Sequence, residues 1–291
     1  MSYKNLICRK RGKVYHITLN RPKKLNALSK ALLLELDEAI TEADGNDDVG
    51  VVVIKGAGKS FSAGFDLQPS ETQREEALKN PALDRKRLAD NQKHWWKIWD
   101  CTKPVIAQIH GYCLAGGTEL AMMCDLVIAA DDAKFGYPPL RDMGSPVTPI
   151  WPWLIGARWA KILYFTGDMI DGKTAESIGM VNFAVPPDKL EKAVKLLTDR
   201  LIKVPVDLLS LHKSQVNMAF EVMGIRGAMA SGPSLDAIGH ASKGAKEGFF
   251  IPAKEKGVKW VLEKRAKLFE GNLFEMIEDL KRKDRDEGFN G

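Results

Sequence analysis

Two short segments that follow extended apolar runs constrain this chain more than any other feature. They read SFSAGFDL at residues 60–67 and GYCLAGGTEL at residues 111–120. Small residues leave backbone N–H groups unobstructed, because glycine carries no side chain to block an approaching atom. Two such N–H groups that converge on one oxygen stabilise the negative charge that a carbonyl gains during reaction. Either segment alone is more typical of an ordinary glycine-bearing turn, so the hypothesis of an oxyanion site depends on their occurring together.

Strand and helix signals alternate along the first two thirds of the chain, which predicts an α/β fold. Residues 13–20 alternate as a half-buried strand does, and Ser29 begins a helix with Leu33, Leu36 and Ile40 in one stripe. Further strands are predicted at 51–54, 104–114 and 126–130, with a short helix at 117–124. Past residue 186 the pattern is mainly helical, with helices predicted at 188–203, 207–220 and 258–269 around a loosely patterned, glycine-rich stretch at 224–248.

Composition narrows the class of protein without choosing one. The chain has 291 residues, 45% of them hydrophobic, which is enough for a large buried core. Residues 1–15 lack the apolar stretch of a secretory signal and no run approaches the ~18 apolar residues of a membrane span, so we expect a cytoplasmic protein that does not enter a membrane. The four cysteines show no CxxC spacing, which predicts neither disulfides nor a metal site.

The charged residues give a weaker indication of the ligand or partner than the two segments do. The net charge is +5, but 43 basic and 38 acidic residues are intermixed, which is typical of an ordinary solvated surface. The small excess of positive charge suits a ligand that carries phosphates. Basic segments at 9–11 and 21–24 could instead bind RNA, but the interspersed acids argue against nucleic acid as a partner.

Glu119 is the acid/base candidate that lies within the second segment. It lies three residues into a helix that begins near Gly116, where the helix dipole favours a carboxylate. From its position alone it could either cap the helix or move protons.

The chain resembles the enoyl-CoA hydratase/isomerase, or crotonase, family. FSAGFDL at 61–67 and IAQIHGYCLAGGTELAMMCDLVIAADDAKFGYP at 106–138 are similar to the family's two signature regions in order and spacing. The resemblance extends over about residues 5–270. It implies a spiral of ββα turns over residues 1–204, which carry the site. It also implies a helical region over 205–291 that closes the pocket and forms a trimer or a dimer of trimers.

The same resemblance implies where an acyl-CoA thioester would bind. Its carbonyl oxygen would lie between the N–H groups of Phe65 and Gly116, and Glu119 would act on a water molecule or a substrate proton. No separate cofactor is implied, since coenzyme A is part of the substrate. Asp66 could equally cap its own turn. The remaining positions that the resemblance implies for substrate and coenzyme A are Ala63, Gly64, Asp66, Leu67, Gly117 and Pro139.

One departure from the family pattern bears on the reaction. Hydratases of this family carry a second glutamate shortly after the phenylalanine-glycine pair, but that position falls here on Pro139, or on Leu140 after a one-residue insertion. Neither residue titrates. Tyr137 and Asp142 are the nearby candidates to replace the lost carboxylate, although Tyr137 could simply line the pocket and Asp142 could pair with Arg141 or Lys134.

The sequence therefore predicts an enzyme that forms an enolate from a CoA thioester, and hydratase or dehydratase chemistry is the first choice. Isomerisation, carbon–carbon bond hydrolysis and decarboxylation use the same oxyanion site and stay open. Clustered tryptophans would suit a bulky or cyclic acyl group if they face it, and would otherwise be core packing. A protein that binds acyl-CoA without catalysis is the alternative from another class.

Overall fold

The centre of the molecule is a six-stranded sheet with strand order β1-β2-β3-β4-β6-β9. The computed structural model describes residues 3–67 and 79–287. The first pair, β1 and β2, is antiparallel, and every later pair in this sheet is parallel. Parallel strands are usually covered on both faces, and all four residues of the predicted strand at 51–54 are fully buried. The strands are β1 (Leu6–Arg11), β2 (Val14–Leu19), β3 (Val51–Gly56), β4 (Val105–Ile109), β6 (Leu126–Ala130) and β9 (Phe183–Val185).

A second, three-stranded sheet contains β5 (Tyr112–Leu114), β7 (Lys134–Gly136) and β8 (Met169–Asp171), in that order. The single strand predicted at 104–114 is therefore wrong, because the chain leaves β4 and enters β5 in the other sheet. Gly111 makes this turn with φ +56°, and a Cβ there would lie 2.0 Å from the Lys59 carbonyl oxygen. Only glycine tolerates both conditions, so the local sequence does encode the break.

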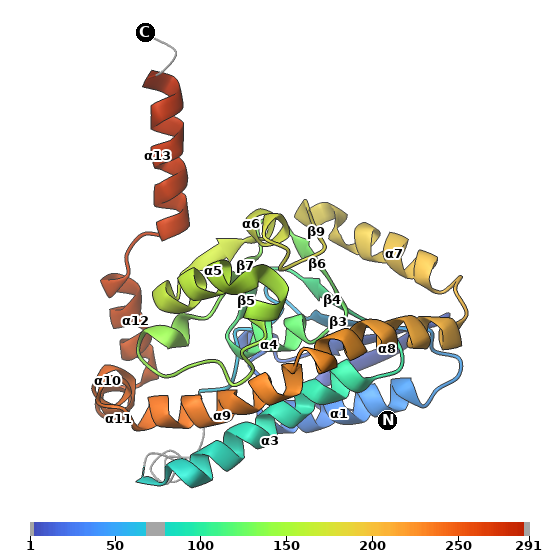
Figure 1. Ribbon diagram of the computed structural model, residues 1–291, viewed down its shortest axis with the longest axis horizontal. Coiled ribbons are helices and arrows are strands. Elements are labelled where there is room, and N and C mark those ends of the chain that lie inside the picture. Colours follow the sequence, from blue (N-terminus) through green and yellow to red (C-terminus); the bar gives the residue numbers. More distant parts are fainter. Residues whose placement is uncertain (1–2, 68–78, 288–291) are drawn as a thin grey trace.

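Helices that follow these strands cover the large sheet (Figure 1). The first of them begins as predicted, since Ser29 Oγ accepts a hydrogen bond from the Leu32 N–H at 3.3 Å. Leu33, Leu36 and Ile40 on its predicted stripe are all buried. The α/β class is thus confirmed. The helices up to residue 201 are α1 (Lys30–Asp44), α3 (Pro81–Asp100), α4 (Gly116–Met122), α5 (Trp151–Thr166), α6 (Gly172–Ser177) and α7 (Leu190–Leu201), with short 3-10 turns at Pro22–Lys24, Pro138–Arg141 and Pro187–Lys189.

From residue 206 onward every element within the described part of the chain is helical. The stretch at 224–248 contains a full helix, α9, that lies side by side with α3 (Figure 1), which the loose pattern did not predict. The amphipathic α13 projects away from the body of the protein (Figure 1). The division into residues 1–204 and 205–291 stays a prediction. The helices are α8 (Val206–Val222), α9 (Ile225–Ala241), α10 (Lys243–Ala245), the π-helix η4 (Lys246–Phe250), α11 (Ile251–Lys256), α12 (Val258–Leu268) and α13 (Leu273–Glu287).

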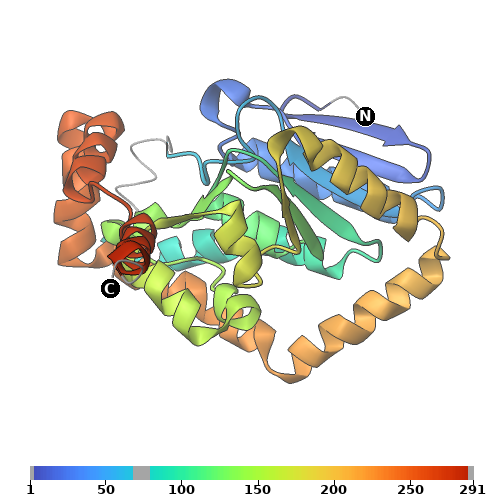
Figure 2. The same cartoon turned by 90° about the horizontal axis from the view of Figure 1, so that it is seen from above.

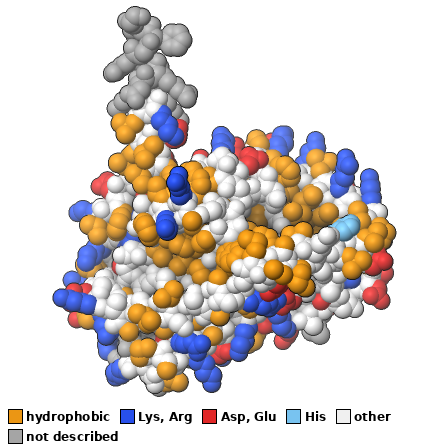
Figure 3. All heavy atoms as spheres, in the orientation of Figure 1, with side chains coloured by type: hydrophobic (Ala, Val, Ile, Leu, Met, Phe, Trp, Pro, Cys, Tyr) orange, Lys and Arg blue, Asp and Glu red, His pale blue; other side chains and the backbone are white. Residues whose placement is uncertain are grey.

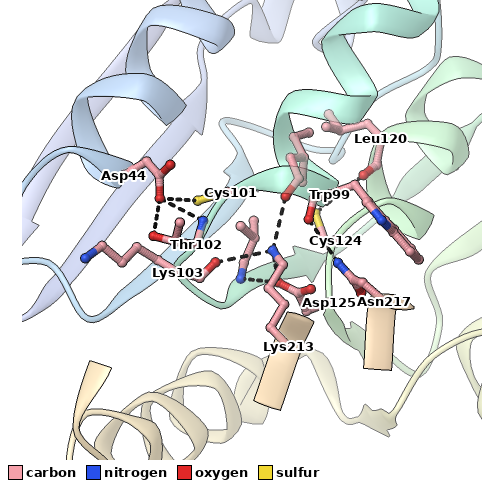
Figure 4. A network of polar contacts seen from close by, with 12 residues as sticks. Asp44, Trp99, Cys101, Thr102, Lys103, Leu120, Cys124, Asp125, Lys213 and Asn217 are labelled. Atoms are coloured by element: carbon pink, nitrogen blue, oxygen red, sulfur yellow. Dashed lines mark hydrogen bonds and ion pairs between the residues drawn. The ribbon is translucent and has the colours of Figure 1, made fainter. Parts of the chain in front are cut away.

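Helix α8 runs along the outer side of the molecule (Figure 2), and Leu209 is its one buried residue. Lys213 connects it to the core, because its Nζ lies 2.8 Å from Asp125 Oδ2 and 3.2 Å from the Ile98 carbonyl oxygen (Figure 4). Asp125 Oδ2 also accepts a hydrogen bond from the Val105 N–H at 2.7 Å. The side chain of Lys213 is only 7% exposed, and its charge is tolerated there because it has both a carboxylate and carbonyl partners. Within the ranges 3–67 and 79–287, no helix has the length and apolar character that crossing a bilayer needs.

Candidate active site

Glu119 is held rigidly inside the protein. It lies on α4 with a relative exposure of 1%. Tyr137 Oη donates a hydrogen bond to its Oε1 at 2.8 Å, and the Val147 N–H donates to the same oxygen at 3.1 Å. Trp95 Nε1 donates to Oε2 at 3.0 Å. Three donors from three different segments therefore fix both carboxylate oxygens.

The surroundings of Glu119 shift its pKa in two opposite directions. Burial raises the pKa of Glu119, since the charged form loses its hydration, and the hydrogen bonds from Tyr137 and Trp95 lower it. The net pKa lies above the ordinary value. Burial and the charge of Glu119 together raise the pKa of Tyr137, so this hydroxyl stays a donor. A carboxyl group with a raised pKa inside a site is suited to both take up and release a proton.

The two glycine-bearing segments lie against each other, as the sequence predicted. The Leu114 N–H donates to the Ser62 carbonyl oxygen at 3.0 Å. A Cβ built on Gly64 would lie 2.8 Å from the Leu114 carbonyl oxygen, and one on Gly116 would lie 2.7 Å from the ring of Phe65. Gly117 is equally close to Ser62, with its Cβ position 2.7 Å from that carbonyl oxygen. Gly64 and Gly117 are required because another stretch of backbone approaches closely, whereas at Gly116 the close neighbour is the side chain of Phe65.

Two backbone donors stand unpaired where the segments meet. Across the described ranges, neither the Phe65 N–H nor the Gly116 N–H has a hydrogen-bond acceptor in the protein. Gly116 is the first residue of α4, and the residue before it, Ala115, has φ +50° and ψ −122°. Such a conformation costs about 1–3 kcal/mol for a residue with a side chain, and strain of this kind is frequent at functional sites. The observed strain thus coincides with a donor that could receive a substrate oxygen.

The predicted residues around Asp66 lie in a small ion-pair cluster. Arg21 donates to Asp66 Oδ2 at 2.7 Å, and Lys24 Nζ lies 3.6 Å from the same oxygen. The Ala63 N–H donates to the Leu25 carbonyl oxygen at 2.9 Å. Leu67 packs against a separate apolar cluster of the C-terminal helices, made of Phe249, Ala253 and Val261. The segment is therefore held at both ends, and basic side chains lie beside it.

The structure separates the two candidates for the missing carboxylate. Tyr137 contacts Glu119 directly, whereas Asp142 forms a two-pronged ion pair with Arg265 on α12. The alternative partners expected for Asp142 are occupied elsewhere, since Arg141 binds Asp168 at 2.6 Å and Lys134 lies 3.9 Å from Glu275.

Pro139 lies in a short 3-10 turn, and its carbonyl oxygen accepts a hydrogen bond from the Met143 N–H at 2.8 Å. Because its ring carries no titratable atom, proline offers no replacement for the second glutamate.

Sequence reasoning missed several residues near Glu119. Trp95 is one of the clustered tryptophans that were predicted either to face the acyl group or to pack in the core, and the structure shows it fully buried with its indole N–H bound to the glutamate. Within the described ranges the buried hydroxyls of Thr148 and Tyr164 make no well-formed hydrogen bond, although the Thr148 hydroxyl lies near enough to Glu119 to lower the pKa of that carboxyl. Tyr164 stacks on Trp151 with ring centroids 4.9 Å apart, and Trp151 meets Tyr137 edge-on. A buried indole N–H or phenol hydroxyl usually has a hydrogen-bond partner. This preference is the signal that could have pointed to Trp95 and Tyr164 as polar contacts of the site.

The described residues contain no group of three or more side chains arranged to hold a metal ion. Burial raises the pKa of Cys8 to about 11 and that of Cys101 to about 12, so these thiols stay protonated. A surface groove of about 310 Å³ lies between the end of α3 and α8, and Trp99 and Lys213 are among the residues that line it. None of the predicted site residues lines this groove.

Comparison with known proteins identifies the family of the chain. The family model for enoyl-CoA hydratase/isomerase matches residues 9–272. Among curated proteins, the crotonyl-CoA hydratase of Syntrophomonas wolfei is 36% identical over 256 residues, which cover 85% of this chain and 94% of that protein. The short-chain-enoyl-CoA hydratase of Clostridium acetobutylicum is 35% identical over 228 residues, 76% of this chain and 84% of that protein.

Solved structures give the same result for the fold. An enoyl-CoA hydratase from Mycobacterium smegmatis superposes with a TM-score of 0.86 at 33% identity, covering 91% of this chain and 94% of that one. An enoyl-CoA hydratase/isomerase from Xanthobacter autotrophicus Py2 gives 0.85 at 33% identity, covering 93% and 100%. The molecule is thus an enzyme of the crotonase fold class. The chain belongs to the enoyl-CoA hydratase/isomerase family, as the resemblance in its sequence indicated.

Proposed function

We propose that this protein hydrates a 2-enoyl-CoA thioester, or dehydrates the corresponding 3-hydroxyacyl-CoA, through an enolate. The observation that carries the proposal is the position of Glu119. It is buried, it accepts hydrogen bonds from three donors, and it lies on the helix that begins at one of two backbone N–H groups without acceptors in the described ranges. The names of the curated relatives, crotonyl-CoA hydratase and short-chain-enoyl-CoA hydratase, support the same chemistry.

In the proposed reaction the thioester oxygen accepts hydrogen bonds from the N–H groups of Phe65 and Gly116. Glu119 takes a proton from water as the water oxygen bonds to Cβ of the substrate, and the Cα=Cβ electron pair moves into the enolate. The enolate then collapses, and Cα receives the proton from Glu119. The net reaction adds one water across the double bond and leaves Glu119 ionised again, so a single carboxylate suffices.

The loss of the second family glutamate then becomes a question of how the water is held. Thr148 adjoins Val147, whose N–H binds Glu119, and Tyr164 stacks on the aromatic wall next to Tyr137. A buried hydroxyl without a partner costs about 1–3 kcal/mol, so these two groups gain from a bound oxygen. We infer that they hold the attacking water or the product hydroxyl in place of the missing carboxylate.

The coenzyme A portion is proposed to run along residues 63–67. The N–H of Phe65, in the middle of this segment, would bind the thioester oxygen, and Arg21 and Lys24 carry positive charge beside Asp66. The net charge of +5 suits a ligand with phosphates.

The test is mass spectrometry of the products after incubation with linear, branched and cyclic enoyl-CoA and β-ketoacyl-CoA thioesters. Gain of one water is expected, and Glu119→Gln should lower the rate by ~10²–10⁴, the usual contribution of a positioned acid or base. Glu247→Gln is the matched control, because Glu247 is an exposed glutamate whose ion pair, with Lys243, lies away from Glu119 on the C-terminal helices. A shifted double bond, an opened ring or loss of carbon dioxide would instead assign one of the sister reactions.

The non-catalytic alternative makes a different prediction. A protein that only binds acyl-CoA would give no product, and its affinity for CoA thioesters would be the same in the wild type and in Glu119→Gln. Isothermal titration calorimetry on both proteins distinguishes this outcome from a failed choice of substrate.

Self-association as a trimer or a dimer of trimers is part of the proposal. Hydrophobic side chains gather on the face that carries α8 (Figure 3), and Leu211, Val222 and Met223 are 64%, 81% and 65% exposed there. Exposed apolar surface of this extent is typical of an interface between subunits. Analytical ultracentrifugation should show a trimer or a hexamer for the wild type and smaller species for Val222→Asp.

A further inference from the structure

A chain of buried charged side chains joins α3 to α9. His240 Nδ1 lies 2.6 Å from Asp84 Oδ2, and His240 Nε2 lies 3.4 Å from Asp236 Oδ1. Arg87 binds the other oxygen of Asp84 at 2.7 and 3.0 Å. Asp84, Asp236 and His240 are 1%, 5% and 9% exposed. Such residues are rarely buried together unless they are paired, as they are here.

This cluster meets Glu119 through one short loop. Asp236 Oδ1 accepts a hydrogen bond from the Ser145 N–H at 2.9 Å, and Glu119 Oε1 accepts one from the Val147 N–H at 3.1 Å. Two buried carboxylates therefore bind the same stretch of backbone two residues apart. A Cβ on Gly144 would lie 2.2 Å from Asp236 Oδ1, so only glycine lets the carboxylate come this close to the loop.

Helix α9 packs closely against the loop through small residues that share one face of the helix. A Cβ on Gly232 would lie 2.1 Å from the Val147 carbonyl oxygen, and one on Gly239 would lie 3.2 Å from Gly144 Cα. Gln92 on α3 donates to the same Val147 carbonyl at 2.7 Å. The backbone that carries one of the three donors to Glu119 is thus fixed by α3 and α9.

If these side chains only held the loop in place, the cluster would not need so many charged groups. Among the described residues, the titratable and charged groups that act on Asp236 are Asp84 and Arg87 from α3 and His240 from its own helix, with Glu119 and Tyr137 beyond the loop. Arg87 already neutralises one of the two aspartates. Burial raises the pKa of Asp236 to about 6, against the opposing effect of His240. The charge of Asp236 also raises the pKa of Glu119.

We propose that Asp236, held in place by His240 and Asp84, is a positioning residue for Glu119. It fixes the loop at 144–147 beneath the glutamate, and its negative charge helps Glu119 to hold a proton and return it. The inference rests on the proposed function in one respect, that Glu119 is the acid/base. It matters most in a chain with Pro139 in place of a second glutamate, because one carboxylate must then act as both base and acid.

The test measures the titration of Glu119 itself. Infrared difference spectra of the wild type minus Glu119→Gln identify the carboxyl band of Glu119, which is followed against pH. In Asp236→Asn this band should titrate at lower pH, since a nearby negative charge has been removed while the acceptor for the Ser145 N–H is kept. Asp168→Asn is the matched control, because it removes an aspartate that pairs with Arg141 instead and should leave the titration unchanged.

If Asp236→Asn folds and Glu119 titrates as in the wild type, the inference is refuted. If the variant does not fold, the wild type decides: Glu119 should titrate in two steps, coupled to Asp236, and a single simple step would overturn the inference. Both measurements need no turnover. The proposed function is tested separately, and it fails if no thioester yields a Glu119-dependent product. If the protein is a hydratase, the acid limb of its kcat/KM profile should also lie at lower pH in Asp236→Asn than in the wild type.

Discussion

Glu119 and Trp95 should be strongly coupled energetically, and the hydrogen-bond geometry predicts the sign. Glu119 offers two acceptor oxygens to three donors. In Glu119→Gln, the amide oxygen can serve Tyr137 and Val147, and the amide NH2 then faces the Trp95 N–H. In the opposite orientation the NH2 faces the Val147 N–H. Either way a buried N–H loses its acceptor, whereas the removal of a buried charge acts in the opposite direction.

A double-mutant cycle with Trp95→Phe separates these effects. In the wild type this change loses a hydrogen bond to a charged group, about 1.5–3 kcal/mol, and leaves a small cavity. In the Glu119→Gln background the same cavity forms, but the change removes a conflict between donors that is worth about 1–3 kcal/mol. The cavity cancels in the cycle. Trp95→Phe should therefore destabilise the Gln variant less than the wild type, by at least about 2 kcal/mol.

The assay is urea unfolding followed by circular dichroism, at a pH above the titration of Glu119. The protein concentration must be the same throughout, because self-association would contribute to stability. Effects that add to within about 0.5 kcal/mol would show that Trp95 and Glu119 do not interact as described, and would refute the three-donor site.

Three further changes test other parts of the molecule. Gly116→Ala should fold but lose ~10²–10³ in kcat, because its Cβ would lie 2.7 Å from the Phe65 ring and displace a donor; Gly227→Ala, with nothing within 4 Å, is the control in a steady-state assay. Ser29→Ala should cost about 1 kcal/mol in thermal or urea unfolding, with unchanged activity, because it removes a helix cap. The raised pKa of Asp236, about 6 when folded, means that the folded state binds its proton more tightly than the unfolded state. This contribution favours folding below about pH 4 and is lost as pH rises to about 6, by up to about 3 kcal/mol, so urea unfolding of the wild type and Asp236→Asn should diverge there; parallel pH profiles would contradict it.

Local sequence determined much of the scaffold. Ser29 begins its helix as the capping preference requires, and the strand at 51–54 is buried as its unbroken apolar run indicated. These features depend on neighbours within a few residues, so they are encoded where they occur. The break at Gly111 is also local, but its reason, the Lys59 carbonyl 2.0 Å from a Cβ position, lies about fifty residues away in the sequence and could not be read in advance.

The candidate site divides in the same way. The sequence by itself determined the family, the pairing of the Phe65 and Gly116 segments, and Glu119 as the acid/base candidate, because all three depend on contiguous motifs. It could not show that Trp95 holds Glu119, that Asp142 pairs with Arg265, or that Asp236 and Glu119 bind one loop. These contacts join residues up to 123 positions apart. Tertiary structure decided them, because a buried carboxylate is stabilised by whichever donors the packed helices bring to it, and no local pattern specifies those partners.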